Sequence, residues 1–160
     1  MADAASPARA LIVPKGHSRC GEPLAIGPDV WTLKVAAADT GGALSVMTWE
    51  GHSPGGPPLH MHHDQDEVFI VKAGRYRFQC GDDQFDLGEG DSIFLPRRVP
   101  HSFCQLSSSG RLCYLYTPAG AMEDFFRALA QLPGPPEPQA GAALFAAHGM
   151  QVMGPPLTPP

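Results

Sequence analysis

The chain has 160 residues, of which 43% are hydrophobic and 17% charged, and this suits a single domain with a modest core. The formal net charge is −5 and no run of Lys or Arg is present, so we expect no nucleic-acid partner. The N-terminal segment lacks the apolar region of a signal peptide, and no stretch approaches the ~20 apolar residues of a membrane span. We therefore expect a cytoplasmic protein without membrane contacts.

Four cysteines are present, and none of them belongs to a CxxC pair. A thiolate zinc site or a CxxC redox motif therefore has no support from the spacing. In a cytosolic protein we expect free, mostly buried thiols, although the spacing alone leaves a disulfide open. The residues concerned are Cys20, Cys80, Cys104 and Cys113.

Strand-like segments begin at Val30, after an Ala-rich, Pro-punctuated start whose first ten residues we expect to be mobile. Residues 30–37 and 43–51 read as two strands joined by a turn at 39–42. The following SPGGPP stretch cannot be the interior of a strand. Seven short apolar segments then alternate with Gly, Asp or Ser, which predicts an antiparallel sandwich or barrel; they are 59–63, 67–73, 75–80, 84–87, 92–96, 101–106 and 111–117.

The pattern becomes helical beyond Pro118. Apolar residues recur at helical spacing from Met122 to Leu132, and Pro133 ends the pattern. We interpret this segment as a helix packed on the barrel, with an amphipathic membrane or partner helix as the alternative. Residues 141–149 favour a second short helix, and we expect the Pro-rich tail after it to be extended.

Three histidines and a glutamate are the candidate metal ligands. His60 and His62 are two residues apart on a predicted strand, so their side chains face the same way, while His63 faces the other way. Glu67 opens the next strand after a polar bend and could reach the same point. His101 lies far along the chain, and local pattern alone does not bring it to the other three. A histidine pair of this kind is more often ordinary strand surface or core than a metal site.

Two motifs resemble those of the cupin superfamily. The first reads PPLHMHHDQDEVFIVKAG and the second reads GDSIFLPRRVPHSFCQ; at the family's spacing they supply His60, His62, Glu67, Gly74, Gly90, Pro96 and His101. The resemblance implies an all-β double-stranded β-helix (a jelly-roll barrel) over residues 30–118. Residues 1–29 would form an N-terminal extension, and residues 119–160 a C-terminal helical and Pro/Gly-rich extension.

The same resemblance implies that His60, His62, Glu67 and His101 hold one divalent transition metal ion. Imidazole and carboxylate ligands suit Fe, Mn, Ni, Co, Cu or Zn, and four ligands leave positions open for substrate or water. The second motif departs from the family pattern at two positions, one in the turn before His101 and one that could affect a contact near the ligands. Arg98 stands where the family usually has Gly; if that position needs a positive φ, either Arg costs about 1 kcal/mol there or the turn differs locally. Gln105 stands where Asn is common.

Further segments make the chain similar to single-domain relatives of quercetin dioxygenase, namely DTGGALSVMTWEGHSPGG and, more loosely, FFRALAQL and LFAAHGMQVMGPPL. This resemblance implies a dioxygenase that cleaves a small aromatic, flavonol-like substrate with O2, in which Glu67 is both ligand and catalytic base. Pocket walls could come from five aromatic residues, each of which is equally suited to the core; these are Phe69, Phe78, Phe94, Phe103 and Tyr114.

Two other functions stay open at this stage. The ion could act as a Lewis acid in an isomerisation, decarboxylation or hydrolysis, or the protein could bind a small molecule without turnover. We also expect a homodimer, because small barrels expose strand edges. Weaker site candidates have simpler interpretations: His52 as a solvated loop residue, Arg97 and Arg98 as exposed loop cations, Trp31 and Trp49 as core or interface residues, and Cys104 as a residue that points away from His101.

Overall fold

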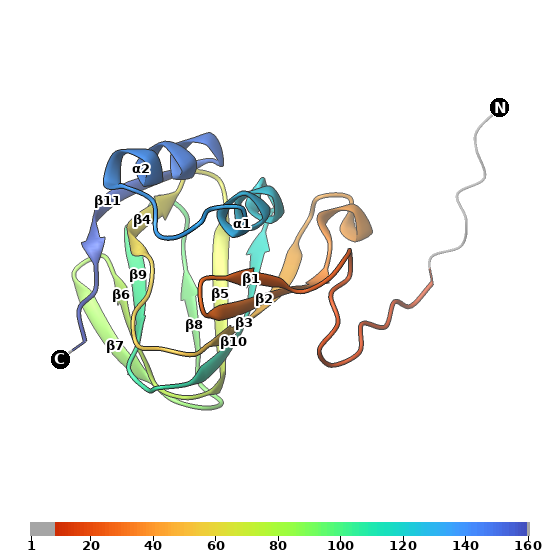
Figure 1. The fold of residues 1–160 in the computed structure, drawn as a ribbon, viewed down its shortest axis with the longest axis horizontal. Coiled ribbons are helices and arrows are strands. Elements are labelled where there is room, and N and C mark those ends of the chain that lie inside the picture. Colours follow the sequence, from red (N-terminus) through yellow and green to blue (C-terminus); the bar gives the residue numbers. More distant parts are fainter. Residues whose placement is uncertain (1–8, 160) are drawn as a thin grey trace.

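A computed structural model describes residues 9–159, which form two antiparallel sheets (Figure 1). The six-stranded sheet has the order β1 (Leu24–Ile26), β2 (Asp29–Val35), β3 (Ser45–Gly51), β10 (Gly110–Thr117), β5 (Asp66–Ala73) and β8 (Ser92–Leu95). The five-stranded sheet has the order β11 (Met150–Pro156), β4 (Pro58–His62), β9 (His101–Gln105), β6 (Tyr76–Cys80) and β7 (Asp83–Leu87). The predicted all-β jelly-roll architecture is confirmed.

Each strand predicted between residues 30 and 117 is present, and alternation of side chains explains why. Along β5, Glu67, Phe69 and Val71 are buried on the inner face, whereas Ile70 is exposed. Gly74 closes this strand with a φ of +88°, and a Cβ there would lie 2.8 Å from the carbonyl oxygen of Ser109. Glycine is therefore required at this tight turn.

The sheets extend beyond residues 30–118 at both ends. The hairpin strand β1 pairs with β2, and the tail strand β11 pairs with β4 through irregular register at Gly154. The tail was expected to be extended, and it is the edge strand of its sheet. A short 3-10 helix, η1 (Ala37–Thr40), occupies part of the predicted turn between β2 and β3. The prediction for the first ten residues lies largely outside the described residues.

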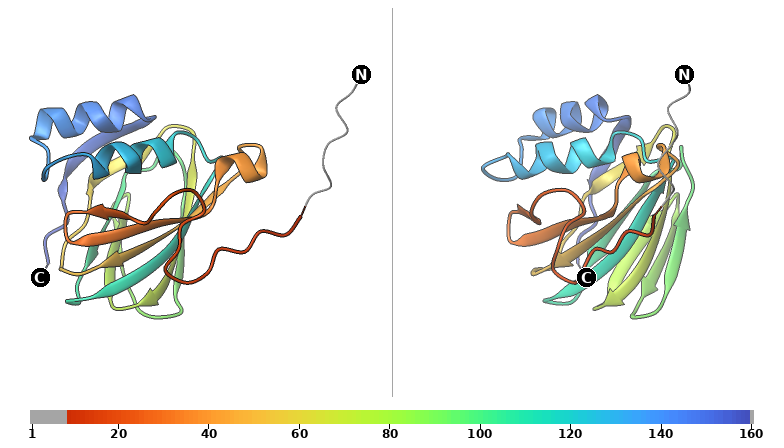
Figure 2. Two further views of the ribbon diagram at one scale, coloured as in Figure 1. Left: turned by 45° about the vertical axis from the view of Figure 1, so that its right-hand side comes forward. Right: turned by 90° about the vertical axis from the view of Figure 1, so that its right-hand side faces the viewer.

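Two helices cover one end of the sandwich, as the two views in Figure 2 show. They are α1 (Met122–Ala130) and α2 (Pro138–Ala147), and both were predicted. The ring of Phe126 on α1 stacks on Trp31 with centroids 5.2 Å apart, and Phe125 meets Phe145 of α2 at 4.9 Å. Helix α1 is therefore packed on the sheets. No helix among the described residues is long and apolar enough to cross a bilayer.

All four cysteines are free thiols, as predicted. Only Cys104 is buried; Cys80 and Cys113 are half-buried, and Cys20 is exposed. The expectation that most of them are buried is therefore too strong. Strands β1, β8, β11 and β7 end the two sheets, so strand edges are present for the homodimer, which stays a prediction.

Candidate metal centre

Strand β4 directs His60 and His62 into the space between the sheets. Both side chains are buried, whereas His63 beyond them is exposed. This alternation follows from the two-residue period of the strand, and it confirms that the two histidines share one face.

His101 joins them from β9. It is the direct cross-strand partner of His60, and their ring centroids lie 4.8 Å apart. The ring of His101 is also nearly parallel to that of His62, at 5.4 Å and 10°. One ligand atom from each of the three histidines lies within 4.8 Å of the others, a spacing that could hold a metal ion.

Glu67 reaches the same point from β5, in the opposite sheet, and only 2% of the residue is exposed. Its Oε2 lies 3.2 Å from Nε2 of His101 and 3.5 Å from Nε2 of His62. The four residues predicted as ligands are therefore close together, three from one sheet and one from the other.

Two of the imidazoles are held in the form that binds metals. Nδ1 of His60 lies 2.7 Å from the carbonyl oxygen of Pro58, and Nδ1 of His101 lies 3.0 Å from that of Val99. A carbonyl oxygen can only accept, so each Nδ1 carries the proton and donates. In the neutral form of each ring, Nε2 then has a free lone pair directed away from that hydrogen bond.

The remaining nitrogens of the cluster have no hydrogen-bond partner. Nε2 of His101 and both ring nitrogens of His62 are buried and have no hydrogen-bond partner, although the two Nε2 atoms lie near Oε2 of Glu67. An unpaired buried polar atom costs about 1–3 kcal/mol. A metal ion between the Nε2 atoms and the carboxylate would remove much of this cost, so the residues present fit such an ion.

Electrostatics keep two members of the cluster, His60 and Glu67, in the form that binds a metal ion. Burial, and then the neighbouring rings of His101 and His62, lower the pKa of His60 to about 3, so this imidazole is neutral. Burial alone would raise the pKa of Glu67, but its contacts with His101 and His62 outweigh burial and lower it. At neutral pH the centre therefore offers the neutral imidazole of His60 and the ionised carboxylate of Glu67.

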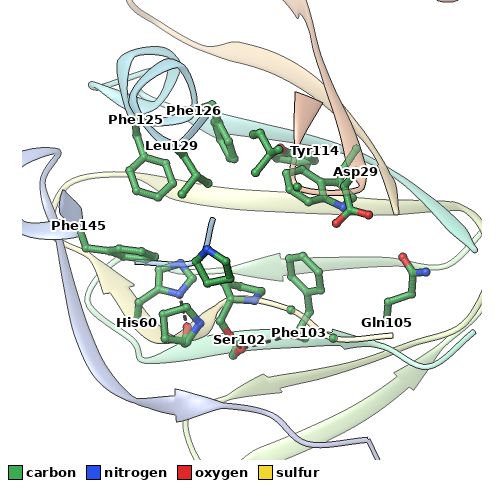
Figure 3. Close-up of a pocket in the computed structure, with 18 of the residues that line it drawn as sticks. Asp29, His60, Ser102, Phe103, Gln105, Tyr114, Phe125, Phe126, Leu129 and Phe145 are labelled. Atoms are coloured by element: carbon green, nitrogen blue, oxygen red, sulfur yellow. Dashed lines mark hydrogen bonds between the residues drawn. The ribbon is translucent and has the colours of Figure 1, made fainter. Parts of the chain in front are cut away.

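A cavity of about 450 Å³ opens beside the histidines, and Figure 3 shows residues that line it. Three metal-ligand candidates, His60, Glu67 and His101, form part of its wall. Most of the remaining wall is apolar. It comes from inward faces of both sheets, from α1 and from the Pro-rich segment between α1 and α2; the aromatic members are Trp49, Phe69, Phe103, Tyr114, Tyr116, Phe125, Phe126 and Phe145.

The comparisons with known proteins agree with this geometry. Residues 45–117 match the family model described as a cupin domain. We therefore identify residues 45–117 as a cupin domain. Two solved structures show the same fold: KdgF from Halomonas sp. (TM-score 0.55, 15% identity, 61% of this chain and 86% of that one) and an RmlC-like cupin from Shewanella frigidimarina (TM-score 0.52, 22% identity, 65% and 87%).

Two curated proteins resemble this cupin in sequence. Quercetin 2,3-dioxygenase from Bacillus subtilis is 28% identical over 92 residues, which cover 58% of this chain and 27% of the enzyme. An uncharacterized protein from Methanocaldococcus jannaschii is 27% identical over 62 residues, which cover 38% of this chain and 50% of that protein. The aligned part of this chain thus spans about a quarter of the length of quercetin 2,3-dioxygenase and half that of the Methanocaldococcus protein.

The predicted pocket wall of this cupin is correct in part. Phe69, Phe103 and Tyr114 line the cavity, whereas Phe78 is fully buried in the core. Phe94 was a wrong candidate, because it lies on the outer face of edge strand β8 with 58% of the residue exposed.

Sequence reasoning missed several residues of the cavity. Helix α1 was predicted, but no local pattern shows that its apolar face covers the histidines rather than another part of the sheets. Asp29, in the β1–β2 hairpin, gave no sequence signal at all. The missed residues that matter most below are Asp29, Tyr116, Phe125, Phe126 and Phe145.

Of the weaker candidates, Trp49 lines the cavity and the others lie outside its wall. His52 is an exposed loop residue, and Arg97 is paired with Asp66 through an ion pair of 2.9 Å. Arg98 adopts a φ of +64°, so the turn keeps the left-handed conformation that glycine favours, at a cost of about 1 kcal/mol. Its backbone N–H donates to the carbonyl oxygen of His62 at 2.7 Å, which ties this turn to the end of β4.

Gln105 has a structural role in this cupin. Its Oε1 accepts from the hydroxyl of Tyr76 at 3.1 Å, and its Nε2 donates to the carbonyl oxygen of Ser107 at 2.9 Å. The amide thus joins β9 to β6 and to the loop that follows β9. Cys104 is buried, and its thiol faces the carbonyl oxygen of Gln105 rather than the cavity.

Proposed function

We propose that this cupin binds one divalent transition metal ion through His60, His62, Glu67 and His101 and acts as a dioxygenase on a small aromatic substrate. The observation that carries the proposal is the set of unpaired imidazole nitrogens beside a largely apolar, aromatic-lined cavity. The volume of about 450 Å³ is in the range of small-molecule sites. The similarity to quercetin 2,3-dioxygenase supports the choice of reaction.

A bound transition metal ion would supply the Lewis acidity and redox chemistry that the reaction of a ring hydroxyl with O2 requires. The chain itself would position and deprotonate the substrate. Glu67 borders the cavity, so its carboxylate can accept the proton of a substrate hydroxyl. The Nδ1–H bonds of His60 and His101 to backbone carbonyls hold the ligand side chains in orientation.

The aromatic wall would exclude water from the reacting ring. The ring of Phe145 meets the ring of His60 edge-on, with centroids 5.2 Å apart, and the ring centroids of Tyr116 and His62 are also 5.2 Å apart. Both atoms of O2 would be retained in the products, so no separate reductant is needed. A flat, apolar substrate with a metal-binding hydroxyl suits this enclosure better than a strongly polar one.

The first test is elemental analysis of the purified full chain, followed by oxygen-electrode measurements with 3-hydroxyflavone. We expect about one transition metal ion per chain and oxygen uptake that depends on both metal and substrate. Metal binding with no oxygen uptake across flavonols and ring diols would contradict the dioxygenase and favour Lewis-acid chemistry. Absence of bound metal, with no gain in thermal stability when Fe, Mn, Ni, Co, Cu or Zn is added, would contradict the metal centre.

A further inference from the structure

The cavity carries a second carboxylate, remote from the histidines. Asp29 begins β2 directly after the β1–β2 turn, and Ile26, Gly27 and Pro28 of this hairpin also line the cavity. Figure 3 shows the Asp29 carboxylate directed into the cavity at the end opposite His60 and Phe145. The two ends of one cavity thus have different chemistry: metal-ligand candidates at one, a lone carboxylate at the other.

This carboxylate is held in place, but only one of its two oxygens accepts a hydrogen bond from the protein. Its Oδ1 accepts the backbone N–H of His52 at 2.8 Å, which anchors the side chain to the loop after β3. The other oxygen has no side-chain or backbone donor and no ion pair among residues 9–159. A half-buried carboxylate with a free oxygen facing a cavity is a ready hydrogen-bond acceptor.

The neighbouring polar group at this end cannot supply the missing donor. The amide hydrogens of Gln105 are directed to the carbonyl oxygens of Ser107 and Gly51, at 2.9 and 3.4 Å. The hydroxyl of Tyr76 donates to Gln105 rather than to Asp29. A donor for the free oxygen of Asp29 must therefore come from outside this hydrogen-bonded group.

The charge of the cavity is one-sided. Among the described residues, no Lys or Arg side chain lines it, while two carboxylates, Asp29 and Glu67, do. Arg97, which follows Pro96 in the second motif, forms an ion pair with Asp66 and does not line the cavity. An anionic group at the Asp29 end would therefore meet a like charge with no fixed cation to offset it.

We propose that Asp29 binds a hydrogen-bond donor, a hydroxyl or amino group, at the end of the substrate remote from the metal. The substrate class is then an aromatic compound with a metal-binding hydroxyl at one end and a neutral or cationic donor at the other. A carboxylate at the remote end is selected against. This inference rests on the proposed function, because the metal-binding group must face the histidines.

Three matched probes test the proposal by binding alone. They are 3-hydroxyflavone, its 4′-hydroxy derivative and its 4′-carboxylate derivative, which share the metal-binding end and differ only at the remote end. Calorimetric titration into the Zn²⁺-loaded full chain without O2 gives the dissociation constants. We expect the 4′-hydroxy probe to bind about tenfold more tightly than 3-hydroxyflavone, because its hydrogen bond is to a charged acceptor, and the 4′-carboxylate to bind most weakly.

The variant Asp29→Asn separates binding from structure. Asparagine keeps an Oδ1 for the N–H of His52 but removes the charge. We expect the preference for the 4′-hydroxy probe to fall below about threefold and binding of the 4′-carboxylate to improve, a gain that structural damage cannot produce. Asp91→Asn is the matched control, because Asp91 also accepts one backbone N–H, from Gly88 at 2.8 Å, but lies outside the cavity wall.

The outcomes distinguish this inference from the function on which it rests. If all three probes bind the wild-type chain equally, or if Asp29→Asn leaves their order unchanged, the role of Asp29 is overturned while the aromatic substrate stands. If none of the probes binds the metal-loaded chain, the proposed function is overturned and this inference with it. The expected order in the wild type, together with its loss in Asp29→Asn alone, supports the proposal.

Discussion

His60 on β4 and His101 on β9 are direct cross-strand partners, with ring centroids 4.8 Å apart. This pair joins the two histidine-bearing motifs, which are far apart in the sequence, at one register position. Glu67 meets them from the opposite sheet. A metal ion bound here would connect three strands and both sheets, so metal binding and the stability of the sandwich are coupled.

Removal of a single histidine should sharply lower metal binding without unfolding the chain. We expect His62→Ala and His101→Ala to lose most of the bound metal, because each removes one of three converging imidazoles. Circular dichroism should still show a β-rich protein, since the surrounding core is unchanged. His63→Ala is the control, because His63 follows His62 directly but is exposed. Equal metal content in all three variants would remove these residues from the site.

Metal should stabilise the wild-type chain against heat. At a free metal concentration of 100 times the dissociation constant, the expected gain is about 2.7 kcal/mol. For a chain of this size that corresponds to a rise in melting temperature of roughly 5–10 °C. Differential scanning fluorimetry with and without a chelator measures this rise. In His101→Ala the rise should vanish, and a rise as large as that of the wild type would place the ion elsewhere.

Glu67→Gln should separate metal binding from catalysis. Glutamine keeps an oxygen that can act as a ligand, and three imidazoles remain, so we expect much of the metal to be retained. The amide cannot accept the substrate proton at neutral pH, so oxygen uptake with 3-hydroxyflavone should fall by about 10²-fold or more. Normal turnover at normal metal content would exclude Glu67 as the base.

Helix α1 should contribute to stability as well as to the cavity wall. Phe126 stacks on Trp31 at 5.2 Å and is almost fully buried. We expect Phe126→Ala to lower the free energy of unfolding by about 3 kcal/mol, at the low end for Phe because the ring borders an existing cavity. Urea unfolding measures this loss. Leu132→Ala, in the more exposed segment after α1, should cost less than about 1 kcal/mol, and equal costs would argue against the stacked helix.

Local pattern was sufficient for the strands between residues 30 and 117 and for the shared face of His60 and His62, because strand alternation is set by the backbone itself. It did not bring in His101, whose position depends on the pairing of β9 with β4. That step came from the resemblance to cupins. The turn at Arg98 is a similar case, since the family's usual Gly left open a positive φ, and only the structure shows that Arg98 adopts one.

The cavity wall could not be predicted for a related reason. Alternation shows which residues of a strand share a face, but not which face is covered, and Phe94 proved to be on the exposed one. The tail strand β11 includes Pro155 and Pro156, which argue against a central strand but are tolerated at an edge. Asp29 lies at the cavity because the β1–β2 hairpin folds beside α1, and no local sequence signal encodes that contact.

The ion pair between Arg19 and Asp39 should make stability depend on pH in the acid range. Nε and Nη2 of Arg19 donate to the two carboxylate oxygens of Asp39 at 2.9 and 2.7 Å, and Asp39 also accepts the backbone N–H of Ala36. The hydrogen bonds from Arg19 and then from Ala36 lower the pKa of Asp39 below its ordinary value near 4.

A carboxyl group with a lowered pKa in the folded state stabilises that state at any pH above its unfolded value. The stabilisation is lost as the pH falls from about 4 through the lower folded value. We therefore expect Asp39→Asn to be less stable than the wild type at pH 6, with a difference that shrinks steadily below pH 4. Urea unfolding at pH 6 and pH 3.5 measures both differences. Asp82→Asn, at an exposed position with no ion pair or side-chain hydrogen bond among the described residues, should show no such change. A difference for Asp39→Asn that stays constant between the two pH values would show that the Arg19 contact does not act through charge.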